Sequence, residues 1–270
     1  MDGMPLEYPV KKSMKCVICG KKTKGNPTCG SPSCAGKLAA AKRKFSIIKN
    51  RYQSLGKLDD ITNILILIAK YFPENPNILE FYGGGIFREK AHKTLKAEIV
   101  SIDNDPIIEI IMKEQQFPWG WGSLYDLADQ HFAEEVFDTI YLDYCGNWTE
   151  SAFNDLEKLF KTQPFVEDKE TLFFITINRS RENFKGESKT FVKTFDDSFT
   201  NQIKKLLPHS SFDPPIYKNE YLSGSNRMVT FGFNRGYNPK PRDTFLASET
   251  AKSMEIAILN YQYAKMRGEK

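Results

Sequence analysis

The chain has 270 residues, of which 40% are hydrophobic and 13% aromatic. This composition supports a sizeable buried core and excludes an intrinsically disordered protein. Its longest apolar run, residues 64–69, is too short to cross a bilayer, and no apolar segment follows a basic start as in a secretory signal. We therefore expect a soluble, intracellular protein without a membrane partner, located in the cytoplasm, the nucleus or a viral particle. The net charge of +4 is unevenly spread, because residues 1–60 hold 13 Lys and Arg against 4 Asp and Glu.

Four of the five cysteines form the pattern Cys16-x2-Cys19-x9-Cys29-x4-Cys34. Thiolates at this spacing suit tetrahedral zinc, whereas a disulfide framework is untypical of a chain of this size in a reducing compartment. Four protein ligands close the coordination sphere, so the predicted Zn²⁺ is structural rather than catalytic. The alternative is a set of unligated thiols.

A helix is predicted over residues 35–52, directly after the last cysteine. This order of knuckle, ligand and helix resembles the treble-clef zinc fingers, many of which bind nucleic acid. Residues 1–52 are thus expected to form a zinc-binding module with a basic helix, followed by a larger domain over 53–270. The candidate nucleic-acid contacts are Lys21, Lys22, Lys24, Lys42, Arg43 and Lys44. The alternatives are a solvated lysine-rich face, or a module that only fastens the N-terminal segment.

The larger domain starts with a helix over 61–71, for which Asp59 or Asp60 is the predicted N-cap. Short apolar runs then alternate with amphipathic helices, which indicates an α/β fold whose mostly parallel sheet is covered by helices on both faces. The predicted strands are 77–82, 98–102, 139–143 and 172–177, and the predicted helices are 86–95, 106–114 and 151–161.

The C-terminal part does not continue this alternation of strands and helices. A helix over 199–207 precedes two strand-like runs, 217–222 and 228–233, joined by Ser223-Gly224-Ser225-Asn226. This pattern predicts an antiparallel hairpin at one edge of the sheet. A last helix is predicted over 249–266.

A cluster of glycines follows the first predicted strand in Ile78-Leu-Glu-Phe-Tyr-Gly-Gly-Gly85. Glycines between a strand and a helix N-terminus let the backbone approach a ligand closely. The next strand ends at Asp103-Asn104, where a carboxylate can accept ribose hydroxyls. The candidate cofactor contacts are Glu80, Tyr82, Gly83, Gly84, Gly85, Asp103 and Asn104.

These motifs resemble the first two motifs of class I (Rossmann-like) S-adenosylmethionine-dependent methyltransferases. The resemblance implies that Glu80 supports the glycine loop and the methionine end of the cofactor, that Asp103 holds the ribose, and that Asp126 contacts the adenine amine. The chain departs from the family pattern at Tyr82, where a glycine is expected. A nicotinamide-binding Rossmann domain also accommodates the glycines, but the predicted hairpin favours the methyltransferase sheet.

The segment Asp143-Tyr-Cys-Gly146 resembles the fourth motif of nucleic-acid amino-methyltransferases, in which an acid grips an exocyclic amine. On this resemblance Asp143 positions the acceptor, and Tyr144 or Trp148 stacks on the base, although the two prolines of the family motif are missing. Cys145 suggests a second mechanism, in which its thiolate attacks a pyrimidine. The alternative is that Cys145 is a small buried thiol without a catalytic role.

Two functions are therefore favoured, and a third alternative, a small-molecule methyltransferase, is disfavoured by the basic zinc module. The first is a methyltransferase that acts on a base of DNA or RNA, with the zinc module assisting substrate binding. The second is a methyltransferase fold without catalysis, serving as a nucleic-acid-binding or assembly subunit of a larger nucleic-acid-processing complex.

Overall fold

The computed structural model describes residues 15–23, 25–51, 53–115, 118–125, 127, 136–144, 148–162, 170–179, 199–203, 206 and 215–235. The chain forms two compact units. The small unit comprises Met1–Ile47 and Asp105–Phe117, and the sheet unit comprises Ile48–Asn104 and Pro118–Lys270. None of the described helices is long and apolar enough to cross a membrane.

The small unit contains the cysteine turns, most of helix α1 (Pro32–Arg51) and helix α4 (Pro106–Gln115). Helix α1 starts with a proline at its first position, and the Ser31 hydroxyl accepts a hydrogen bond from the Cys34 amide at 3.3 Å. Both helices bury a short apolar stripe. The buried residues are Leu38, Ala41, Ile108, Ile111 and Met112.

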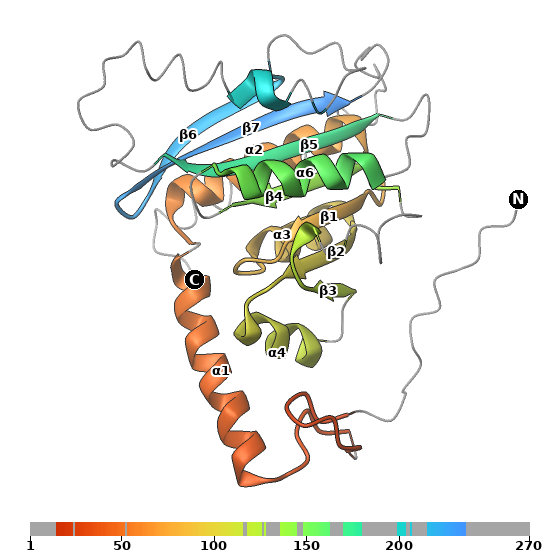
Figure 1. The fold of residues 1–270 in the computed structure, drawn as a ribbon, viewed down its shortest axis with the longest axis vertical. Coiled ribbons are helices and arrows are strands. Elements are labelled where there is room, and N and C mark those ends of the chain that lie inside the picture. The colour runs from red at the N-terminus through yellow and green to blue at the C-terminus, as the bar shows by residue number, and fades with distance from the viewer. Residues whose placement is uncertain are drawn as a thin grey trace, which may run out of the picture. The chain divides into compact units, whose positions relative to one another are not determined.

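In the described part of the sheet unit, seven strands form one sheet in the order β3-β2-β1-β4-β5-β7-β6 (Figure 1). The strands are β1 (Asn77–Phe81), β2 (Glu98–Asp103), β3 (Trp119–Trp121), β4 (Thr139–Asp143), β5 (Thr171–Arg179), β6 (Tyr217–Ser223) and β7 (Asn226–Arg235). The first five strands in this order are parallel to one another, and β7 runs antiparallel to both β5 and β6. The expected mostly parallel sheet with a C-terminal antiparallel hairpin is confirmed.

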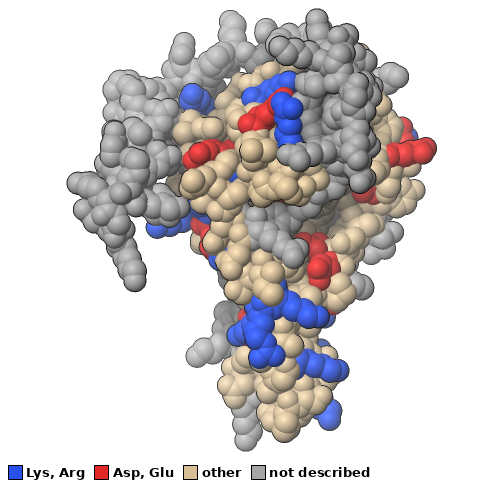
Figure 2. All heavy atoms as spheres, turned by 90° about the vertical axis from the view of Figure 1, so that its left-hand side faces the viewer, with Lys and Arg blue, Asp and Glu red and all other residues tan. Residues whose placement is uncertain are grey.

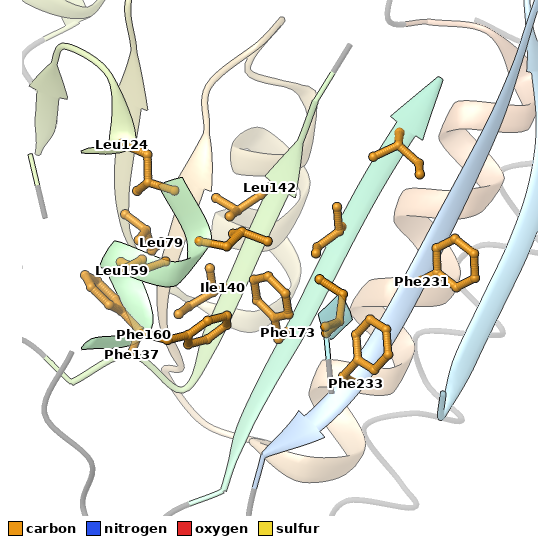
Figure 3. Close-up of a cluster of buried hydrophobic side chains, with 14 of the residues drawn as sticks. Leu79, Leu124, Phe137, Ile140, Leu142, Leu159, Phe160, Phe173, Phe231 and Phe233 are labelled. Atoms are coloured by element: carbon orange, nitrogen blue, oxygen red, sulfur yellow. The ribbon is translucent and has the colours of Figure 1, made fainter. Parts of the chain in front are cut away.

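Side-chain alternation along the strands divides the core between the two faces of the sheet. On one face, Ile140 and Leu142 of β4 join a cluster with Leu156, Leu159 and Phe160 of α6 (Glu150–Thr162), and Figure 3 shows part of it. On the other face, the core is formed with α2 (Leu55–Tyr71) and α3 (Ile86–Leu95), which cover Tyr141 of the same strand. Helices therefore cover both faces, as the sequence predicts.

The predicted start of α2 and its predicted N-cap were wrong, and one short strand was not predicted. One predicted helix lies outside the described residues. Helix α2 begins at Leu55, because the Ser54 hydroxyl accepts a hydrogen bond from the Lys57 amide at 3.3 Å and serves as its N-cap. Asp60, a predicted cap, lies inside the helix and is fully buried. The strand β3 was not predicted. The helix predicted over 249–266 lies outside the described residues.

Candidate functional site

The four cysteine sulfurs converge in the small unit. All four lie within 4.8 Å of one another, and those of Cys19 and Cys29 are 3.7 Å apart. Four thiolates around one zinc ion at bond lengths of about 2.3 Å have sulfurs about 3.8 Å apart, so this donor set fits the metal. The turn is closed by the Cys16 amide, which donates to the Lys21 carbonyl at 2.8 Å, and by a left-handed Gly20 (φ 72°).

Exposed Lys and Arg side chains gather on the surface of the small unit (Figure 2). Among the predicted contacts, Lys42 is held at 2.6 Å by Glu114 of α4, and Lys24 lies outside the described residues. The structure adds a lysine of α1 that was not predicted. Lys37 is exposed and lies two helical turns before Lys44, on the same side of the helix. We define the basic face as Lys21, Lys22, Lys37, Arg43 and Lys44, for which no ion pair is found among the described residues.

The glycine cluster forms a tight turn at the carboxyl end of β1. The Tyr82 amide donates to the Ile102 carbonyl at 3.0 Å, and the Gly85 amide donates to the Tyr82 carbonyl at 2.7 Å. Gly83 and Gly85 are left-handed (φ 50° and 70°), and Gly84 is buried. A Cβ atom on Gly85 would lie 2.9 Å from the Tyr82 ring. Tyr82, the departure from the family pattern, is thus accommodated because its ring folds back onto the glycine that caps α3.

Glu80 is completely buried beneath this turn. The Ser101 hydroxyl donates to Glu80 Oε1 at 2.7 Å, and Arg88 in turn donates to that hydroxyl at 2.8 Å. Glu80 Oε2 has no hydrogen-bond partner among the described residues. Burial raises the pKa of Glu80 to about 8, and the negative charges of Asp103 and Asp143 add to this rise. Glu80 is therefore close enough to Asp103 and to Asp143 to interact with both.

This pKa gives a prediction for Glu80→Gln. Since the pKa in the folded chain lies above the ordinary value of 4.5, the stability contributed by protonated Glu80 is complete below that value and is lost as the pH rises to about 8. Relative to Glu80→Gln, the wild-type free energy of unfolding should fall by about 1.4 kcal/mol per pH unit between about pH 5.5 and 7.5. Urea titrations across this range measure it.

The matched control is Glu98→Gln, which removes an exposed carboxyl group at the first residue of β2. It should keep the pH dependence of the wild type. Parallel stability curves for wild type and Glu80→Gln would contradict the buried, protonated state of Glu80.

The carboxyl end of β2 borders a hollow of about 870 Å³. Asp103 ends the strand, and its carbonyl accepts a hydrogen bond from the Gly122 amide at 3.1 Å. Asn104 lines the hollow together with residues that follow β3 and with polar side chains of α6. The further lining residues are Ser123, Tyr125, Glu150, Ser151, Asn154, Asp155, Glu157, Lys158 and Lys161. Asp126, the predicted adenine contact, lies outside the described residues.

Asp143 ends β4 with its side chain on the face that α2 covers, and only 7% of that side chain is exposed. The Lys57 ammonium lies 2.7 Å from Asp143 Oδ2. The sequence did not suggest this lysine, because 86 positions separate the two residues. Its position in the first turn of a helix is typical of a solvated lysine.

Tyr144 and Trp148, the predicted stacking residues, pack within an aromatic cluster. Tyr144 meets Phe81 edge to face at 4.9 Å between ring centroids, and Trp148 meets Phe199 in the same way at 4.8 Å. The Trp148 indole N–H donates to Gln202 Oε1 at 2.7 Å. Burial raises the pKa of Tyr144 well above its ordinary value. The structure therefore gives both rings a packing role, and Cys145 lies outside the described residues.

Solved structures similar to this chain include several methyltransferases. The N-methyltransferase NodS from Bradyrhizobium japonicum WM9 is 13% identical at a TM-score of 0.45, covering 69% of this chain and 99% of that one. Human methyltransferase-like protein 13, solved with SAH, is 16% identical at a TM-score of 0.44, covering 71% and 88%. TrmN from Thermus thermophilus is 12% identical at a TM-score of 0.41, covering 65% and 48%. No protein-family model and no curated protein sequence matched the chain.

Proposed function

We propose that this protein is an S-adenosylmethionine-dependent methyltransferase that acts on a base of DNA or RNA. The observation that carries the proposal is the cluster of Glu80, Asp103 and Asp143 beside a left-handed glycine turn, at the carboxyl edge of a parallel sheet. Ligands bind at this edge in open α/β folds. S-adenosylmethionine carries a sulfonium and an ammonium group, and the negative charge of Asp103 beside the buried Glu80 carboxyl group suits a cationic ligand.

The roles follow from position. Glu80 Oε2 is buried and has no hydrogen-bond partner among the described residues. It can therefore accept a hydrogen bond from the ammonium group of the cofactor. Asp103 accepts the ribose hydroxyls, and Asn104 borders the hollow at the nucleoside end. When bound, the cofactor supplies an electrophilic methyl group to the acceptor. Asp143 accepts a hydrogen bond from that acceptor and orients it.

Nucleic acid as the substrate is supported by the basic face of the small unit. A zinc ion held by Cys16, Cys19, Cys29 and Cys34 orders the turns that carry Lys21 and Lys22, and α1 carries the remaining cations. Such a face binds phosphates without reading sequence, so the choice of acceptor belongs to the sheet unit. A larger nucleic-acid-processing complex is compatible with this division.

Calorimetric titration with S-adenosylmethionine tests the cofactor site. Asp103→Ala should weaken binding roughly 10- to 100-fold, because a hydrogen bond to a charged group contributes about 1.5–3 kcal/mol. The control Glu98→Ala, at the other end of the same strand, should bind like the wild type. Incubation with labelled cofactor and separate DNA and RNA pools, followed by nucleoside analysis, then identifies the acceptor.

The opposite result is equally informative. If the wild type does not bind the cofactor, the chain is a non-catalytic subunit of this fold. In that case Asp103→Ala should leave nucleic-acid affinity unchanged.

A further inference from the structure

The first turn of α2 sends one charged side chain into the interior of the sheet unit. The Lys57 side chain is 5% exposed, and its ammonium donates a hydrogen bond to Tyr141 Oη at 2.6 Å while it pairs with Asp143 Oδ2 at 2.7 Å. It also lies 5.7 Å from the centre of the Tyr221 ring. A lysine in this position has lost its hydration, and Asp143 provides the balancing charge.

Anchoring of the helix is achieved by another residue. Asp60, one turn further along α2, accepts hydrogen bonds from Tyr217 at 2.8 Å, Asn219 at 2.9 Å and Thr230 at 2.7 Å. These three donors come from β6 and β7 and hold α2 on that side of the sheet. Lys57 instead reaches β4 and contacts the strand at the residue where the candidate acceptor site begins.

A buried ion pair is also a poor device for stability alone. Its desolvation cost offsets much of the Coulomb attraction, so a packed apolar pair of similar volume often stabilises as well or better. Burial by itself lowers the pKa of Lys57, but Asp143, Tyr141, Tyr221 and Asp60 together outweigh this, and the pKa is raised well above its ordinary value. The charged form of Lys57 is therefore favoured in the folded chain, and its ammonium contacts the Asp143 carboxylate from one side.

The surroundings keep this pair in one geometry. The Tyr141 ring stacks on Phe87 at 4.3 Å between centroids. Gly56, which precedes Lys57, lies so close to the hairpin that a Cβ atom on it would be 2.8 Å from Tyr221 Cβ. The start of α2 therefore has little freedom to move relative to β4 and β6.

We propose that Lys57 is a positioning residue for methyl transfer, which fixes the orientation of the Asp143 carboxylate toward an N–H group of the acceptor. This inference rests on the proposed function. With Oδ2 occupied by Lys57, the carboxylate cannot rotate freely, and the acceptor nitrogen is held with its lone pair toward the methyl carbon. As the N–C bond forms, the S–C bond breaks and sulfur keeps its electron pair. The acceptor nitrogen then releases its proton to solvent, so charge and atoms balance.

The test compares Lys57→Met, Lys57→Arg, Asp143→Asn and the double variant Lys57→Met/Asp143→Asn. Lys57→Met should bind S-adenosylmethionine within about threefold of the wild type but lose about 100-fold in kcat, as expected for a misplaced orienting group. Lys57→Arg keeps the charge and should recover at least about tenfold of that loss. Because Lys57 acts through Asp143, the double variant should be no slower than Asp143→Asn alone.

A matched control is Lys90→Met, the same substitution at a lysine of α3 that reaches Thr62 of α2. It should change kcat by less than about threefold.

The positioning role alone would be overturned if the wild type binds cofactor and is active but Lys57→Met keeps its kcat. Additive losses in the double variant would also overturn it. A wild type that neither binds cofactor nor methylates would overturn the proposed function and this inference with it. If Lys57→Met does not fold, Lys57→Arg decides when it is compared in the wild-type and Asp143→Asn backgrounds. A loss in kcat of up to about tenfold that disappears in the Asp143→Asn background supports the role. An unchanged kcat, or the same loss in both backgrounds, contradicts it.

Discussion

Removal of zinc is expected to unfold the small unit. Among the described residues, its apolar interior consists of a few side chains of α1 and α4, which are too few to stabilise a module of this size alone. Structural zinc contributes an apparent free energy of about 10–16 kcal/mol in zinc-finger peptides, far more than such a core supplies. The four thiolates in the small unit are thus expected to make its folding dependent on the metal.

The measurement combines metal analysis with hydrogen exchange. The purified chain should hold one zinc per chain, and Cys34→Ser or a strong chelator should abolish amide protection along α1 while β4 and β5 remain protected. Ser33→Ala, at an exposed position next to Cys34, is the matched control and should retain both zinc and protection. Full protection of α1 in a metal-free chain would show that the cysteines do not hold the unit together.

The sheet could be predicted because its strands follow simple rules. Thr139–Asp143 was predicted at its observed bounds, since it is a short apolar run ending in a carboxylate. The hairpin was predicted from two strand-like runs around a Ser-Gly-Ser-Asn turn. The carboxylates Glu80 and Asp103 were placed at one sheet edge for the same reason, because the carboxyl ends of parallel strands coincide there.

The start of α2 could not be predicted in this way. Lys57 and Asp60 are polar residues in the first turns of a helix, and local rules assign such residues to solvent or to a cap. Both are buried against their partners, Asp143 and Thr230. These partners lie far along the chain, so local rules could not reveal the burial. Tertiary pairing of this kind leaves no periodic signal in one sequence. The strand β3 was missed for a different reason, since its three residues are too few to show a strand period.

Binding of nucleic acid is expected to depend strongly on three cations of α1. Lys37, Arg43 and Lys44 are exposed and belong to the basic face. Each phosphate contact contributes about 0.7–0.9 to the slope of log K against log salt concentration. Replacing all three with Gln should therefore reduce the slope by about 2–3 and weaken binding about 100- to 1000-fold near 0.1 M salt. Glutamine has a helix propensity similar to that of lysine and arginine, so α1 itself should persist.

The decisive comparison is with Lys42→Gln in the same helix. Lys42 carries the same charge, but Glu114 neutralises it at 2.6 Å, so it should release few counterions when a phosphate approaches. We expect its slope to stay within about half a unit of the wild type in fluorescence anisotropy titrations with a DNA and an RNA oligonucleotide. If the triple variant and Lys42→Gln lost affinity in simple proportion to the charge removed, binding would reflect net charge rather than the basic face. If neither variant altered the slope, the nucleic-acid contact would lie elsewhere, and the small unit would serve only to order the N-terminal segment.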